Sequence, residues 1–277
     1  MAESQGMPRQ RFLKREILVY ILFFLTYMPT WIWMYDRWMD NNSYYGHGPL
    51  IPLISLALIF NKRSVLTGLE QRSSDLGLKC IYWGMAVHLL SALFQIYFTS
   101  GFSMLIVLAG IILHFHGEKV LKKSLFPLFF LIFMIPLPII IVITFSFKLK
   151  LLAAKLAVFI LNQLKIPAIR EGSLIKMPYS YVVVEDACSG LRSLISLMAL
   201  GSLFGYSMQS TLFKRFLLFA VSIPIAVFTN ALRITLLSFV SEIWGSAYAA
   251  GVLHNLSGFL VFAIAYVLLI FAKRIIA

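Results

Sequence analysis

Residues 182–194 read VVVEDACSGLRSL and join two kinds of sequence. The valines before Glu185 favour extended backbone. From Cys188 onward the chain is mostly apolar over about 20 positions, the length that crosses a membrane as a helix. The stretch therefore predicts a junction between an extended segment and a membrane span over 188–208, with a thiol at the junction.

The whole chain has the composition of a multi-spanning membrane protein. Of its 277 residues, 60% are hydrophobic and 13% are charged, and its mean hydropathy is +0.88. These values lie beyond those of soluble globular domains. We expect a single all-α membrane domain over 1–277 with about eight transmembrane helices. The candidate spans are 17–36, 49–61, 77–97, 101–117, 125–147, 188–208, 213–233 and 255–272.

The basic residues indicate which gaps between spans face the cytoplasm. Lysine and arginine total 24 against 11 acids, a formal charge of +13. They gather mainly in every second gap and at both ends of the chain, including the tail 1–16. The positive-inside rule makes these parts cytoplasmic, so both termini are expected inside. The excess of basic residues is therefore expected to set the orientation of the chain in the membrane and to contact membrane lipids. Nucleic acid is not expected as a partner. The first apolar segment is too long for a signal-peptide core and is expected to be retained.

The gap 148–187 differs from the other external gaps. Its first part, KLKLLAAKLAVFILNQLK, suits an amphipathic helix at the membrane interface. The following REGSLIKMPYSYVVVEDA favours a strand or hairpin. We therefore expect a small external cap over 148–187, followed by the helices of 188–272. Prolines within the spans predict kinks, at Pro127, Pro136, Pro138 and Pro224.

The acids and cysteines exclude several classes of site. All 11 acids lie in gaps or at the ends of the candidate spans. The sequence therefore lacks both the paired intramembrane aspartates of aspartyl proteases and the buried acids typical of proton-coupled pumps. Cys80 and Cys188 do not make a disulfide framework, and no metal site or cofactor is expected. His114 and His116 are spaced like a metal pair but have no third ligand, which favours anchoring at the interface.

Three reactive side chains are predicted at one depth of the membrane. Cys188 begins the sixth candidate span, Arg233 ends the seventh and His254 opens the eighth, all on the external side. A helix N-terminus lowers the pKa of a cysteine, and a thiolate is a nucleophile. Arg233 could stabilise the oxyanion formed at an attacked carbonyl, and His254 could carry a proton to the leaving amine. Taken singly, each residue has an ordinary explanation, as a packing cysteine, a snorkelling arginine or an interfacial histidine.

Other polar residues are candidates for support of this site. Glu185 and Asp186 add negative charge beside the thiol, or instead cap the following helix. Arg192 faces either the site or a lipid phosphate. His47, in YYGHGPL before the second span, borders the site or serves a turn. Three further supporting candidates lie beside the main residues, namely Ser189, Gly190 and Asn230.

These segments together resemble a known family. EDACSGLRSL at 185–194, NALR at 230–233 and the histidine of LHNLSG at 254 are similar, in order and spacing, to three signature blocks of the exosortase/archaeosortase family. The lead into the cysteine, REGSLIKMPYSYVVVEDACSG, and the early YYGHGPLIP also resemble that family. The resemblance extends from about residue 35 to residue 272.

The resemblance implies a multi-pass cysteine transpeptidase. Its substrates are exported proteins with a C-terminal tripartite signal, which consists of a short motif such as Pro-Glu-Pro, a transmembrane helix and a basic tail. By this resemblance Cys188 is the nucleophile, Arg233 the transition-state stabiliser and His254 the acid/base. The implied location is the cytoplasmic (inner) membrane, with the site on its outer, periplasmic face. The acceptor of the cleaved protein is unknown.

Two alternatives stay open from the sequence. One is a protease of the same geometry, in which water is the acceptor. The other is a transporter or a protein that handles lipid-linked sugars without cysteine chemistry, in which the basic external cap holds a phosphate. Replacement of Cys188 separates the enzyme from this second alternative, because only the enzyme needs the thiol.

Overall fold

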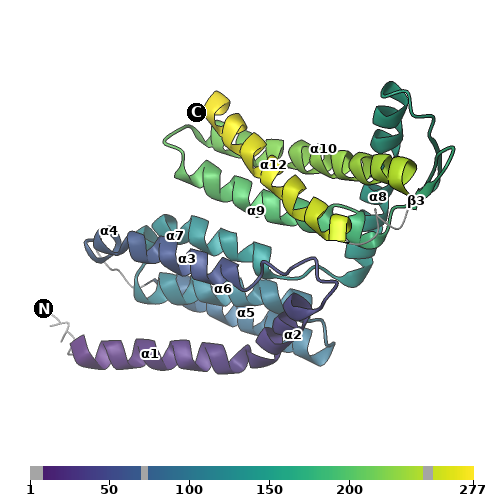
Figure 1. Ribbon diagram of the computed structural model, residues 1–277. Coiled ribbons are helices and arrows are strands. Elements are labelled where there is room, and N and C mark those ends of the chain that lie inside the picture. Colours follow the sequence, from purple (N-terminus) through teal and green to yellow (C-terminus); the bar gives the residue numbers. More distant parts are fainter. Residues whose placement is uncertain (1–8, 70–73, 246–251) are drawn as a thin grey trace, which may run out of the picture. The chain divides into compact units, whose positions relative to one another are not determined.

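Figure 1 shows the fold of the chain in a computed structural model. The structure describes residues 9–69, 74–245 and 252–277 and, within these, the side chains of all residues except 9–14, 187 and 252–255. The chain is mostly helical and divides into two compact units. Unit 1 comprises 1–40 and 46–136, and unit 2 comprises 41–45 and 137–277.

Unit 1 consists of helices joined by short turns. The described elements are α1 (Arg9–Thr26), α2 (Met28–Met39), α3 (Leu50–Asn61), α4 (Arg63–Thr67), α5 (Asp75–Leu93), α6 (Tyr97–Phe115), α7 (Glu118–Phe130) and the 3-10 helix η1 (Leu131–Met134). The helices α1 and α2 are bent by 57° at Tyr27. Pro29 lies in the first turn of α2, where its missing N–H is harmless. The first predicted span is therefore a broken helix.

Glycines allow α5 and α6 to pack closely. A Cβ atom at Gly77 would lie 2.5 Å from the backbone nitrogen of His114, and one at Gly110 would lie 2.9 Å from the carbonyl oxygen of Gly77. A side chain at either position would force the two backbones apart. Small residues at helix crossings are a common means of association within membranes, where burial of apolar surface supplies little driving force.

Buried polar side chains also join the helices of unit 1. Tyr27 Oη and Ser103 Oγ lie 2.9 Å apart, and Ser100 Oγ lies 2.6 Å from Thr30 Oγ1 and 2.8 Å from His88 Nδ1. These hydrogen bonds connect the α1–α2 region with α5 and α6. A polar group in an apolar interior is costly without a partner, so this network favours one packing of the helices.

Unit 2 combines helices with a small sheet (Figure 1). Its elements are α8 (Ile139–Gln163), β1 (Ile169–Glu171), β2 (Leu174–Lys176), β3 (Tyr181–Val183), the 3-10 helix η2 (Asp186–Cys188), α9 (Leu191–Ser207), α10 (Leu212–Trp244) and α12 (Val252–Ile276). The sheet is antiparallel in the order β1-β2-β3. The long helix α10 packs against α8, α9, α12 and β3. Glu242 near its end accepts hydrogen bonds from Tyr179 N at 3.1 Å and from Ser180 Oγ at 2.8 Å, which ties the β2–β3 turn to α10.

The lengths of the helices support fewer spans than eight. Among the described residues, four helices are long and apolar enough to cross a membrane, and the number is six if each of two bent helix pairs forms one span. The difference from eight lies in two predicted spans, 49–61 and 188–208. They correspond to α3 with 12 residues and α9 with 17, whereas about 20 residues are needed. The all-α membrane class is thus confirmed, and the count of eight is not.

The predicted boundary between the fifth span and the cap is wrong. The cap was expected to begin at residue 148 with a separate interfacial helix, but α8 is continuous from Ile139 to Gln163. The chain leaves helical structure earlier, at Ile135–Pro138. Pro136 and Pro138 cannot donate hydrogen bonds to a helix and disfavour helical backbone before them. The expected strand or hairpin is present as the three-stranded sheet.

The predicted end of the seventh span is also wrong. It was placed at Arg233, but α10 continues to Trp244 and ends only at Gly245, where φ is +94°. Its 33 residues give a length of about 50 Å at 1.5 Å per residue, against a hydrocarbon core of about 30 Å. No glycine or proline lies between Arg233 and Trp244 to stop the helix. Arg233 therefore lies within α10 instead of at its end.

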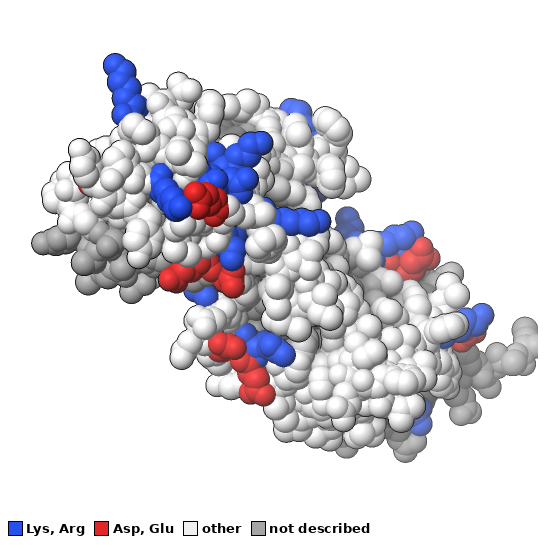
Figure 2. All heavy atoms as spheres, turned by 90° about the vertical axis from the view of Figure 1, so that its right-hand side faces the viewer, with Lys and Arg blue, Asp and Glu red and all other residues white. Residues whose placement is uncertain are grey.

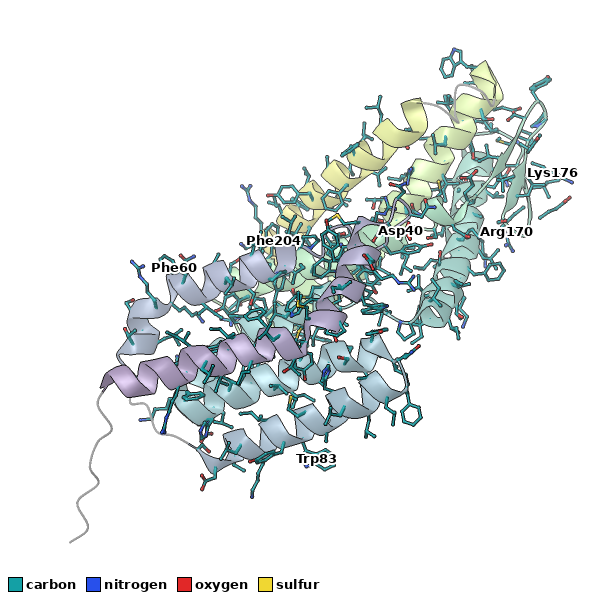
Figure 3. The ribbon with its side chains drawn as sticks, turned by 90° about the horizontal axis from the view of Figure 1, so that it is seen from below. Asp40, Phe60, Trp83, Arg170, Lys176 and Phe204 are labelled. Carbon is teal, nitrogen blue, oxygen red and sulfur yellow. The ribbon has the colours of Figure 1, made fainter. Side chains whose placement is uncertain are left out.

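The surface of each unit is largely apolar, as expected for a protein in lipid. The face in Figure 2 is mostly uncharged, with lysines, arginines and acids in small groups. In unit 1 the side chains of Trp83 and Phe60 are 73% and 61% exposed (Figure 3). Arg170 and Lys176 lie on the sheet of unit 2 (Figure 3). Large exposed patches of this kind mark contact with lipid or with other proteins.

Candidate active site

Cys188 lies in a tight turn between the sheet and α9. It ends η2, and its backbone N donates to the carbonyl oxygen of Glu185 at 3.0 Å. Gly190 follows as the N-cap of α9, with φ at +83°. A left-handed φ is costly for any residue with a Cβ atom. The turn from the sheet into α9 thus depends on glycine two residues after the thiol.

Small side chains of α8 make room for this turn. Cys188 is 5% exposed and belongs to a buried cluster with Ala153, Ala154 and Ala157 of α8. The same cluster includes Ile175 of β2 and Ile234 of α10. Three alanines on one helix allow the neighbouring backbone to approach closely. The thiol is consequently held in an apolar environment at the meeting point of three elements.

Asn230 of α10 fixes the backbone of the cysteine. Its side-chain nitrogen Nδ2 donates to the carbonyl oxygen of Cys188 at 3.0 Å, and the residue is 3% exposed. A Cβ atom at Gly190 would lie only 2.7 Å from this amide group. The hydrogen bond from Asn230 to Cys188 therefore requires that position 190 has no side chain.

Arg233 lies one turn after Asn230 and connects α10 to α12. Its Nε atom donates to Ser257 Oγ at 3.0 Å, and a methyl group at Gly258 would lie 3.7 Å from its Nη2 atom. Position 254 is three residues before Ser257 and four before Gly258, and residues at these spacings share one face of a helix. The backbone of α12 therefore places position 254 on the face that Arg233 contacts. The side chain of His254 lies outside the described residues.

The electrostatics at the thiol differ from the sequence-based expectation. Cys188 lies in the turn before α9, outside the helices that span the membrane, and burial raises the pKa of its thiol. The charge of Arg233 lowers this pKa and the charge of Glu185 raises it, but burial is the largest influence. The expected lowering by a helix N-terminus is thus wrong for the resting protein, because desolvation disfavours a thiolate. Burial therefore favours the protonated thiol in the resting protein.

The two acids of the opening stretch have different surroundings. Asp186 forms an ion pair with Lys150 of α8, with 2.6 Å between Oδ1 and Nζ, and the lysine side chain is only 14% exposed. Glu185 is exposed, and its charge acts on the thiol. Neither residue makes a side-chain cap on the helix that follows it. The capping alternative is therefore not supported, and Asp186 instead ties the cysteine turn to α8.

The remaining sequence candidates lie in different places. Ser189 is buried, and its Oγ accepts a hydrogen bond from Leu191 N at 3.4 Å. Arg192 is exposed on α9. His47 belongs to unit 1, in the turn before α3, whereas the cysteine turn belongs to unit 2. The structure brings together Cys188 and Asn230 with Arg233.

Sequence reasoning missed residues that support this arrangement. Ser257 lies within LHNLSG at helical spacing from His254, so the period of 3.6 residues could have indicated it. No pattern in the sequence could have indicated Lys150 and Glu242, because the residues they contact are distant in the chain. Within the described part of the chain, no group of three or more histidines, cysteines and acids could hold a metal ion.

Comparison with known proteins gives one match. Residues 38–271 match the model of a protein family described as "Transmembrane exosortase (Exosortase_EpsH)". This range covers most of the chain and includes the cysteine turn, Asn230, Arg233 and position 254. Neither a curated protein nor a solved structure matches. The chain therefore belongs to the transmembrane exosortase family.

Proposed function

We propose that this protein is a cysteine transpeptidase that removes the C-terminal tripartite sorting signal of exported proteins, with Cys188 as nucleophile. Membership of the exosortase family makes it in general a membrane sorting transpeptidase that acts on exported proteins. The observation that carries the specific proposal is the joint placement of the cysteine turn, Asn230 and Arg233. Asn230 and Arg233 lie one turn apart on α10, the first bound to the cysteine turn and the second to α12 beside position 254.

The proposed reaction begins with attack by Cys188 Sγ on the carbonyl carbon of a substrate peptide. His254 takes the proton from the thiol, Arg233 stabilises the oxyanion, and the proton passes to the amine as the carbon–nitrogen bond breaks. The signal helix and basic tail leave with this amine. An acceptor nucleophile then attacks the thioester carbonyl carbon, His254 takes the proton of the acceptor, and the carbon–sulfur bond breaks as that proton passes to Cys188 Sγ. Burial raises the pKa of Cys188 and so disfavours its thiolate, which is why the proposed reaction includes a base that takes the proton.

We place this site on the outer face of the cytoplasmic membrane, with both termini inside. The distribution of basic residues supports this orientation. The helix α10 exceeds the bilayer thickness, so its last turns, which hold the sheet through Glu242, can lie outside the hydrocarbon core. The sheet and the cysteine turn form the external cap in this proposal. A substrate carbonyl just outside its own membrane helix would then lie at the depth of Cys188.

The proposal is tested by expression beside an exported protein that ends in a Pro-Glu-Pro motif, a transmembrane helix and a basic tail. We expect the native protein to shorten this substrate and Cys188→Ala to leave it at full length, with equal amounts of both variants in the membrane. Mass spectrometry of the new C-terminus identifies the acceptor, and a free carboxylate would assign water. Shortening of the substrate by Cys188→Ala would refute the proposed chemistry.

Gly190→Ala should reduce substrate processing by about 10-fold or more. The added methyl group meets the amide of Asn230 at 2.7 Å, so the hydrogen bond to Cys188 is lost and the thiol moves. A displacement of about 1 Å at a reacting group can cost about 10²-fold in rate. The assay is the rate of substrate shortening in membranes.

Gly172→Ala is the matched control for this prediction. Gly172 also has a positive φ, of +63°, but no atom lies within 4 Å of its Cβ position. Both changes strain the backbone, and only Gly190→Ala causes a collision. Equal losses for the two variants would show that strain in the sheet region, and not the position of Cys188, limits processing.

A further inference from the structure

Unit 1 contains a cavity that the proposed reaction does not use. It is lined by residues of α1, α3, α4, α6 and α7, and its volume is about 750 Å³. Ligand cavities in proteins are commonly about 300–1,000 Å³. Most of its wall is apolar, and its lining includes Leu56, Ala57 and Ile59 of α3 and Ile112 of α6. The space therefore suits a hydrocarbon chain.

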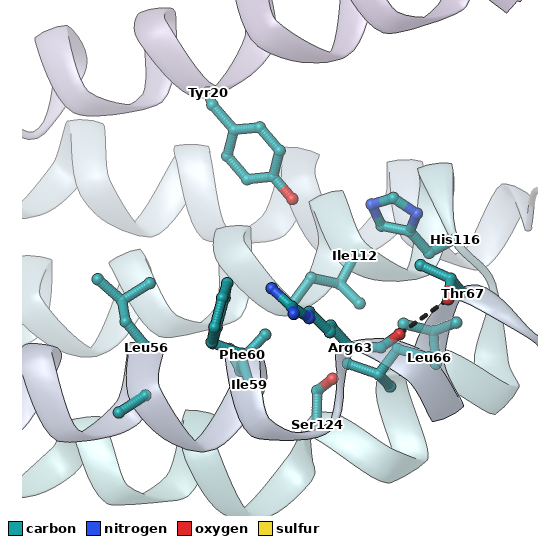
Figure 4. Close-up of a pocket in the computed structure, with 12 residues that line it drawn as sticks. Tyr20, Leu56, Ile59, Phe60, Arg63, Leu66, Thr67, Ile112, His116 and Ser124 are labelled. Atoms are coloured by element: carbon teal, nitrogen blue, oxygen red, sulfur yellow. Dashed lines mark hydrogen bonds between the residues drawn. The ribbon is translucent and has the colours of Figure 1, made fainter.

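Polar groups gather at one end of this cavity. Arg63 of α4 has its guanidinium carbon 4.2 Å from the ring centre of Phe60, and the close-up in Figure 4 shows it beside Ile59 and Leu66. The ring of Tyr20 reaches from α1 toward the same space, and His116 lies at the edge (Figure 4). The cavity thus has a cationic group next to an apolar chamber.

The charges around this end favour an anion. His116, which lines the cavity, has its Nε2 atom 2.8 Å from Glu16 Oε1, so this acid already has a partner. Lys62 precedes Arg63, and α7 begins with further basic residues, Lys119, Lys122 and Lys123. Lys122 forms an ion pair with Glu118 of α7, with 2.6 Å between Nζ and Oε1. Among the described residues named here, basic side chains therefore outnumber acids.

The same basic residues belong to gaps that the sequence assigns to the cytoplasm. The cytoplasmic leaflet is the one whose anionic lipids attract basic clusters beside membrane helices, at about 1 kcal/mol for each lysine or arginine. A lipid offers an acyl chain and a phosphate in one molecule. We propose that this cavity binds an anionic phospholipid, with an acyl chain between α3 and α6 and the phosphate on Arg63.

The test measures lipid retention by the full-length protein in detergent with native mass spectrometry. We expect the native protein to keep phosphatidylglycerol in preference to phosphatidylcholine. Arg63→Gln should weaken phosphatidylglycerol binding about 5- to 10-fold. Arg170→Gln, which removes an exposed arginine from the sheet of unit 2, should leave binding unchanged. Equal binding by the native protein and Arg63→Gln would overturn the proposal.

A second pair of variants tests the cavity itself. Ala57→Phe places a ring in the chamber and should reduce phosphatidylglycerol binding at least about 5-fold, because the acyl chain loses its space. Leu53→Phe on the same helix serves as the control, since Leu53 is 62% exposed and is not part of the cavity lining. Equal losses in the two variants would contradict a site in this cavity.

Thermal melting separates a lipid from a free anion. A ligand that binds only the folded protein raises the melting temperature by mass action. We expect phosphatidylglycerol to do so and inorganic phosphate to do nothing at the same concentration. Stabilisation by phosphate alone would replace the lipid with a simple anion site. None of these measurements depends on Cys188, so their outcome does not affect the proposed reaction.

Discussion

Cys188→Ser should reduce substrate processing by at least about 10³-fold while the fold is retained. The change replaces one atom by a smaller one in a buried cluster whose other members are unchanged. Serine keeps the shape of the side chain with only a small loss of volume, but its hydroxyl is a weak nucleophile at its own pKa. Losses of this size are typical when a catalytic nucleophile is removed. The rate of substrate shortening, divided by the amount of protein in the membrane, measures the effect.

Cys80→Ser provides the control for the loss of a thiol. Cys80 is the other free cysteine, and it lies on α5 in unit 1. We expect its replacement to leave processing unchanged. If Cys188→Ser processes the substrate as fast as the native protein, Cys188 is a packing residue and the reaction needs another nucleophile.

Arg233→Gln should reduce the rate constant for processing by about 10²- to 10³-fold. Glutamine keeps a polar group but removes the charge that, in the proposed reaction, stabilises the oxyanion. The loss of one such donor in other enzymes has a cost of this size. Because this interaction forms in the transition state, kcat should fall with little change in KM. Single-turnover rates at several substrate levels separate the two constants.

Two further variants sharpen this prediction. Arg233→Lys keeps the charge but loses the Nε–H that donates to Ser257, so it should restore only part of the activity. Arg192→Gln removes an exposed arginine of α9 and should have no effect. A rise in KM with unchanged kcat for Arg233→Gln would assign Arg233 to substrate binding instead of transition-state stabilisation.

Much of the fold followed from local properties of the chain. The apolar segments at 77–97 and 101–117 correspond to α5 and α6, since hydropathy and length are visible in any window of sequence. The run of β-branched residues before Cys188 does contribute to a strand, β3. By contrast, the predicted ends of the spans within α8 and α10 were wrong, because lysines and arginines in these helices were taken as ends of spans. A charged side chain within a helix is tolerated where it finds a partner, as Lys150 and Arg233 do.

The order of Cys188, Arg233 and His254 along the chain was enough to indicate the family, and the apolar composition was enough to indicate the membrane. The raised pKa of the thiol could not be predicted from the sequence, since it depends on burial against α8. Nor could the contacts of Asn230 with Cys188 and of Asp186 with Lys150, whose partners are 42 and 36 residues apart. Composition and spacing are properties of neighbouring residues and can be read along the chain. Burial and these hydrogen bonds arise only when helices pack, because packing sets which distant groups lose water and meet each other.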